Sequence, residues 1–146
     1  MLRFICLLPL AALLAGHSTT ALGSSLDLYG VFFKSGHPLK GETIEEAVTD
    51  ADQIANVNRS VDLIKRYPSV RFEIAGHTDQ SECSGQECHA LAQRRALFLY
   101  RFLLAAGVDP LCVIALTEYG STRPIAGKPV DSWRNQRAEL NVDIEP

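Results

Sequence analysis

Apolar positions along the chain follow two different periods, and these periods predict its secondary structure. Between residues 44 and 67 apolar residues recur every three or four positions, which predicts an amphipathic helix; they are Ile54, Val57, Val61 and Ile64. Pro68 ends this helix, because the residue before a proline disfavours the helical conformation. A second helix is predicted from residue 90 to residue 106, with Gly107 as its C-terminal cap.

Other segments alternate with a period of two or are rich in β-forming residues, and they are predicted to be strands. Val70, Phe72 and Ile74 alternate with charged Arg71 and Glu73. The remaining strands are expected at residues 26–33, 113–119 and 138–145, and the 113–119 strand is expected to be central. The order strand, helix, strand, helix, strand, strand predicts an α+β fold, a two-layer sandwich with both helices packed on one sheet.

The N-terminus predicts export from the cytoplasm. Arg3 precedes twelve apolar residues, and a small-residue cleavage site follows at Ala21-Leu22-Gly23. This is typical of a secretory signal peptide, and the apolar run is shorter than the roughly 20 residues that span a bilayer. We therefore expect a signal peptide at residues 1–23 and one domain at residues 24–146. His17 stands where a lipoprotein signal would have its cysteine, so no lipid anchor is expected.

Charge and cysteine content narrow the function of the exported domain. The full chain has 14 basic and 17 acidic residues, and removal of Arg3 with the signal peptide changes its net charge from −3 to −4. Such a balance gives no support to nucleic-acid binding. In an oxidising compartment Cys83 and Cys88 are close enough in sequence to form a disulfide, whereas Cys112 begins an apolar run and is expected to be a buried thiol.

The second predicted helix separates its two adjacent arginines. At 100° per residue, Arg94 falls on the solvent face, whereas Arg95 falls between Leu99 and Phe102 in the apolar arc. A buried guanidinium needs a counter-charge, because an unpaired buried charge is costly. Asp79, in the loop between the 70–75 strand and this helix, is the expected partner. The pair is either a structural bridge or a site for a ligand with an ammonium and a carboxylate.

Several motifs then resemble the peptidoglycan-binding C-terminal domain of the OmpA family. They occur in the family's order between residues 70 and 144: Gly76-His77-Thr78-Asp79, Leu91-Ala92-Gln93-Arg94-Arg95-Ala96, Gly107-Val108-Asp109, Tyr119-Gly120-Ser121, Pro124-Ile125-Ala126 and Asn135-Gln136-Arg137-Ala138-Glu139-Leu140. The resemblance implies a mixed sheet and a periplasmic, non-catalytic protein associated with the cell wall. It also implies that no cofactor is needed.

The resemblance also implies a ligand and a role for particular residues. In that family the corresponding Asp and Arg hold the diaminopimelate residue of the peptidoglycan stem peptide. Carried over, Asp79 takes the ammonium and Arg95 the carboxylate, and Thr78, Asn135 and Arg137 border the pocket. No membrane anchor is expected in the chain, so we expect any association with the outer membrane to come through an outer-membrane or other envelope protein partner.

Some positions depart from the family pattern. Cys88 and His89 stand where an Asn is frequent, and the cysteine loop is one residue longer than usual. The other departures are Lys34, Ala92, Ser132 and Gln136. These leave the Asp79–Arg95 pair intact but change the residues expected around it.

Three other functions are compatible with parts of the sequence. A metal site would use the cluster of His77, Asp79, Cys83, Cys88 and His89, although this is not a common zinc spacing. A nucleophilic hydrolase has less support, because the chain lacks a Gly-x-Ser-x-Gly motif. The third alternative is a periplasmic protein-interaction module on the same fold, in which the pocket serves a protein partner.

Overall fold

The computed structural model describes residues 26–142 as an α+β domain. In chain order the elements are β1 (Val31–Phe32), α1 (Ile44–Ala47), α2 (Ala51–Arg66), β2 (Phe72–Gly76), α3 (Gln86–Ala105), the 3₁₀ helix η1 (Pro110–Cys112), β3 (Val113–Glu118), the 3₁₀ helix η2 (Pro129–Asn135) and β4 (Arg137–Val142). The predicted signal peptide at residues 1–23 lies outside the described residues. No helix within residues 26–142 is long and apolar enough to cross a membrane.

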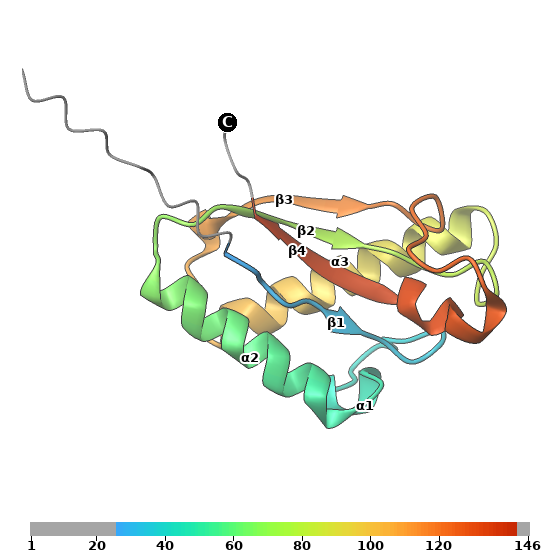
Figure 1. The fold of residues 1–146 in the computed structure, drawn as a ribbon, viewed down its shortest axis with the longest axis horizontal. Coiled ribbons are helices and arrows are strands. Elements are labelled where there is room, and N and C mark those ends of the chain that lie inside the picture. The colour runs from blue at the N-terminus through green and yellow to red at the C-terminus, as the bar shows by residue number, and fades with distance from the viewer. Residues whose placement is uncertain (1–25, 143–146) are drawn as a thin grey trace, which may run out of the picture.

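The four strands form one mixed sheet in the order β1-β4-β2-β3. β2 and β3 are parallel, whereas β4 lies antiparallel to both β1 and β2. The helix α3 runs behind β2, β3 and β4, and α2 lies beside β1 (Figure 1). The predicted fold, two helices packed on one mixed sheet, is therefore confirmed.

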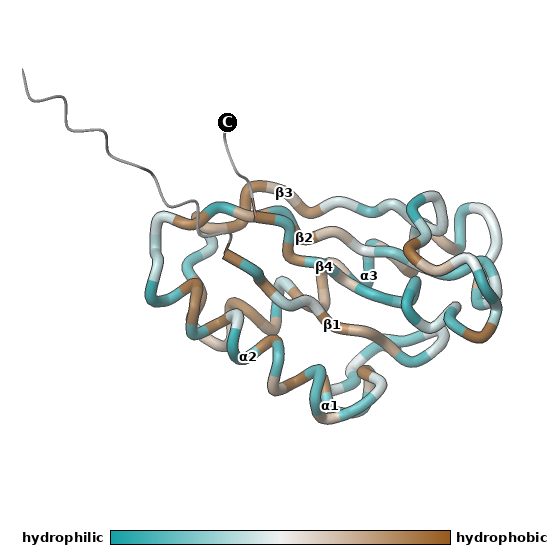
Figure 2. Tube along the Cα trace, viewed as in Figure 1, coloured by the Kyte–Doolittle hydropathy of each residue, from teal (hydrophilic) through white to brown (hydrophobic). Residues whose placement is uncertain are grey.

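The hydrophobic core lies between the helices and the sheet. Apolar and polar residues alternate along α2 and along the strands (Figure 2), so each element has one face to bury. Phe33, Ile64, Phe72 and Leu99 are almost fully buried in this core. Cys112 is also buried and is a free thiol, as predicted.

The predicted helix from residue 44 to residue 67 is divided in two. Val48 leaves the helical conformation and forms a β-bridge with Phe33. Asp50 then caps α2, accepting hydrogen bonds from the N–H groups of Asp52 and Gln53. Apolar spacing did not show this break, because the four residues that define the spacing, from Ile54 to Ile64, all lie in α2.

The expectation that the third strand is central was wrong. β3 is an edge strand and pairs only with β2 among the described strands. Ile114 is 51% exposed and Leu116 is 40% exposed, although both are apolar. Strand order depends on contacts distant in sequence, so a β-rich composition does not distinguish an edge strand from a central one.

Candidate functional site

The candidate site lies at the end of the sheet where β2 and β3 end and η2 begins (Figure 1). Gly76, the last residue of β2, allows α3 to pass very close to the sheet. A Cβ atom on Gly76 would lie 1.9 Å from the carbonyl oxygen of Ala92. This close contact fixes the helix turn that carries Arg95 against the start of the Asp79 loop.

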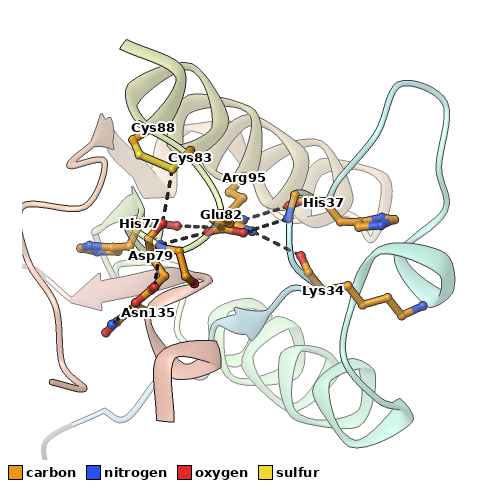
Figure 3. A network of polar contacts seen from close by, with 11 residues as sticks. Lys34, His37, His77, Asp79, Glu82, Cys83, Cys88, Arg95 and Asn135 are labelled. Carbon is orange, nitrogen blue, oxygen red and sulfur yellow. Dashed lines mark hydrogen bonds and ion pairs between the residues drawn. A yellow bond between two sulfur atoms is a disulfide. The ribbon is translucent and has the colours of Figure 1, made fainter. Parts of the chain in front are cut away.

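Arg95 is fully buried, whereas Arg94 is exposed, as helical phase predicted. Its five N–H groups all donate hydrogen bonds, and three of the acceptors are backbone carbonyls (Figure 3). Nε donates to His37 at 2.9 Å, Nη1 to His77 at 2.9 Å and Nη2 to Lys34 at 3.3 Å. The side chains of these three residues point away from the guanidinium (Figure 3).

The two remaining N–H groups of Arg95 bind the carboxylate of Glu82, not that of Asp79. Nη1 lies 2.6 Å from Oε1 and Nη2 lies 2.8 Å from Oε2, a bidentate ion pair. The expected direct ion pair between Asp79 and Arg95 is therefore wrong. Sequence reasoning missed Glu82, although one signal was available: it is an acid directly before Cys83, the first cysteine of a loop that is one residue longer than usual.

Asp79 is held by polar groups. Its Oδ2 accepts a hydrogen bond from Asn135 Nδ2 at 2.7 Å, and its Oδ1 accepts one from the Ser81 N–H at 2.8 Å. Burial raises the pKa of this carboxyl, but the bonds from Asn135 and Ser81 outweigh that effect and leave the pKa below its usual value. Asp79 is thus ionised at neutral pH. Within residues 26–142 no basic side chain forms an ion pair with it.

An open cavity of about 390 Å³ lies beside this carboxylate, between the Asp79 loop and the chain that leads into η2. Thr78, Asp79 and Asn135 line the cavity, so the structure brings together three of the predicted site residues. Lys128 lines it too and is exposed. Arg95 is buried and does not border the cavity, and its partner Glu82 does not border it either.

Arg137 lies elsewhere, beside a separate depression next to β1. Its Nε donates to Glu139, and Nη2 donates to the carbonyl of Arg123 at 3.3 Å. Nε2 of the buried His77 lies 3.3 Å from the same Glu139 carboxylate. The His77 imidazole, and after it Arg137, lower the pKa of Glu139 to about 2, against the opposing effect of burial.

The predicted disulfide between Cys83 and Cys88 is present and joins the loop to the first turn of α3. Both sulfur atoms are thereby removed from the set of possible metal ligands. Within residues 26–142 no group of three or more His, Cys, Asp or Glu side chains is arranged to hold a metal ion. The metal cluster considered from the sequence is therefore not assembled here.

The mixed sheet, its two long helices α2 and α3 and the acid after β2 define a class of domain, and comparison with known proteins gives the family. Residues 44–138 match the OmpA family, and the chain belongs to it. It is 30% identical over 105 residues to outer membrane porin F of Pseudomonas fluorescens, and 39% identical over 72 residues to the peptidoglycan-associated lipoprotein of Pseudomonas aeruginosa. The first match covers 69% of this chain and 31% of the porin; the second covers 48% of this chain and 42% of the lipoprotein. The chain thus spans less than half of either relative.

Solved structures share the fold, among them two with a TM-score of 0.64. The peptidoglycan-associated lipoprotein of Burkholderia pseudomallei is 26% identical, with a TM-score of 0.64, and the match covers 79% of this chain and 90% of that one. The C-terminal domain of Helicobacter pylori MotB has the same TM-score at 23% identity, covering 82% of this chain and 87% of that one. At 23% identity, the similarity to the MotB domain concerns the fold alone.

Proposed function

We propose that this protein binds peptidoglycan non-covalently in the periplasm, through the diaminopimelate residue of the stem peptide, and that it is not an enzyme. Membership of the OmpA family supports this proposal, as does the likeness to two lipoproteins named for their association with peptidoglycan. The observation that carries it is the ionised Asp79, which faces an open cavity and has no cationic partner among the described residues. A ligand ammonium group supplies the missing positive charge.

In this proposal Asp79 takes the ammonium, and Asn135 holds Asp79 in position. Thr78 contributes to the cavity wall, whereas Arg137 lies outside it and donates hydrogen bonds to Glu139 and to the Arg123 carbonyl. Arg95 is the proposed contact for the ligand carboxylate. Because Glu82 occupies its guanidinium, that contact forms only when the Glu82 side chain leaves.

The expected affinity for one stem peptide is modest. Each charged hydrogen bond contributes about 1.5–3 kcal/mol net, and only two or three are available. Firm attachment to the wall then requires several domains acting together, since multivalency raises avidity without new contacts. An envelope partner that clusters copies of this protein would meet that need.

Co-sedimentation with purified cell-wall sacculi tests the proposal. We expect the wild-type protein and Arg94→Ala to pellet with sacculi and Asp79→Ala to stay in the supernatant. Arg94 is the matched control, because it is a neighbouring arginine on the exposed face of the same helix. The proposal fails if the wild type does not pellet, or if Asp79→Ala pellets as fully as the wild type.

A protein-interaction module is the second candidate, and one observation favours it. Ile125, Val130 and Trp133 are apolar and exposed in η2 and the segment before it, close to the cavity. Such side chains are common in protein interfaces. If the wild type stays in the supernatant with sacculi, this candidate replaces peptidoglycan binding.

A further inference from the structure

The carboxylate of Glu82 lies beside the backbone of Asp79. Its Oε1 accepts a hydrogen bond from the Asp79 N–H at 3.0 Å, and its Oε2 accepts one from the Gly36 N–H at 2.8 Å. With the two bonds from Arg95, it accepts four hydrogen bonds, about the full capacity of a carboxylate. The Glu82 side chain is only 1% exposed. It therefore occupies a complete carboxylate-binding site made by its own chain.

The surroundings of Arg95 admit no second carboxylate. Each of its five N–H groups already has an acceptor, and two of those acceptors are the Glu82 oxygens. A ligand carboxylate can gain a bidentate contact only by taking the position of the Glu82 carboxylate. We infer that Glu82 is a specificity-determining residue, which competes with the ligand carboxylate for Arg95 and leaves the wild-type site to recognise mainly the ammonium. This inference rests on the proposed function.

Covalent and backbone links hold Glu82 in this position. The next residue, Cys83, is joined to Cys88 at the start of α3, so the chain after Glu82 is tied to the helix that carries Arg95. The chain before Glu82 is tied by the Ser81 N–H bond to Asp79. The Glu82 carboxylate can leave Arg95 only if its hydrogen bonds to Arg95, Asp79 and Gly36 break. Few molecules at any time therefore have Arg95 available.

The competition between Glu82 and the ligand carboxylate should be visible in the affinities for two forms of the same ligand. A site that contacts only the ligand ammonium should bind two stem peptides with similar affinity: one with a free diaminopimelate carboxylate, and one in which that carboxylate is a carboxamide. Replacing Glu82 makes the guanidinium available to the ligand. The apparent affinity should then rise for the carboxylate form alone, because affinity is reduced by the fraction of molecules competent to bind.

The oxidised protein is titrated by isothermal calorimetry with two soluble tripeptides. One is L-alanyl-γ-D-glutamyl-diaminopimelate. In the other, the diaminopimelate carboxylate on the carbon that carries the free ammonium is a carboxamide. We expect the wild type to bind both with similar affinity. Glu82→Gln should bind the carboxylate form about tenfold more tightly and the carboxamide as the wild type does. Glu87→Gln removes the same charge from the exposed first turn of α3 and should change neither affinity.

Circular dichroism shows whether each variant is folded, because Glu82→Gln leaves Arg95 without its counter-charge. If that variant does not fold, Glu82→Asp keeps the charge but shortens the side chain, and it should show a smaller gain for the carboxylate form. The inference is overturned if the folded variants bind the carboxylate form no more tightly than the wild type, or if the wild type already prefers it about tenfold. If the wild type binds tripeptides and sacculi but the variants show no gain, the proposed function stands alone. If no protein binds either tripeptide or sacculi, both fail.

Discussion

Asn135 donates a hydrogen bond of 2.7 Å to the Asp79 carboxylate. The same side-chain amide also binds the backbone of residues 125 and 126, before η2. Its Oδ1 accepts the N–H groups of Ile125 and Ala126, and its Nδ2 also donates to the Ala126 carbonyl. One buried side chain thus joins the acid after β2 to the opposite wall of the cavity. The position of Asp79 therefore depends on a residue 56 positions away in the sequence.

Replacing Asn135 should destabilise the domain and loosen the cavity. Asn135→Ala leaves two backbone N–H groups and part of a charged carboxylate without partners, and we expect a loss of about 2–3 kcal/mol in the free energy of unfolding. Urea denaturation followed by circular dichroism measures this loss. Asn58→Ala, at an exposed position on α2, is the control and should change stability by less than about 0.5 kcal/mol. Equal losses in the two variants would contradict the role given to Asn135.

The two adjacent arginines of α3 should differ sharply in their effect on stability. Arg95→Ala leaves the buried Glu82 carboxylate and three carbonyls without their donor, and removal of one partner of a buried ion pair costs about 3–5 kcal/mol. Arg94→Ala should cost less than about 0.5 kcal/mol, because Arg94 is exposed. Thermal unfolding of both variants gives the comparison. Similar melting temperatures would show that the Arg95–Glu82 pair adds little to stability.

Helical phase was sufficient to predict the burial of Arg95, because a regular helix places side chains at known angles. Its partner could not be predicted in the same way. Glu82 lies in an irregular loop, where side-chain direction depends on the disulfide and on contacts with the segment around Gly36. For the same reason the sequence indicated a site near Asp79 but did not show that Asn135 positions it.

Acid should weaken the fold partly through Glu139. Its pKa is about 2 in the folded protein, below the ordinary value of 4.5, so its stabilising effect is complete above about pH 4.5 and is lost as pH falls towards 2. In Glu139→Gln this contribution is absent. The stability difference between the wild type and this variant should therefore shrink between pH 5 and pH 2, which denaturant unfolding at several pH values measures. A difference that stays constant over this range would contradict the assignment.

Gly76 should tolerate no side chain. Gly76→Ala places a Cβ atom 1.9 Å from the Ala92 carbonyl oxygen, so β2 and α3 must move apart. We expect a loss of about 3 kcal/mol or more in the free energy of unfolding, or failure to fold. Gly127→Ala is the matched control, since a Cβ there meets no atom within 4 Å. The close contact is not needed for folding if both variants unfold at the same urea concentration.

The carboxylates of Asp79 and Glu82 differ in their exposure to solvent and should therefore differ in their response to ionic strength. Salt screens charges that face water far more than charges buried in the protein. Asp79 faces an open cavity, whereas Glu82 and Arg95 are sealed together away from solvent. Added salt should therefore weaken binding of the proposed ligand ammonium to Asp79 and have little effect on the buried ion pair between Glu82 and Arg95.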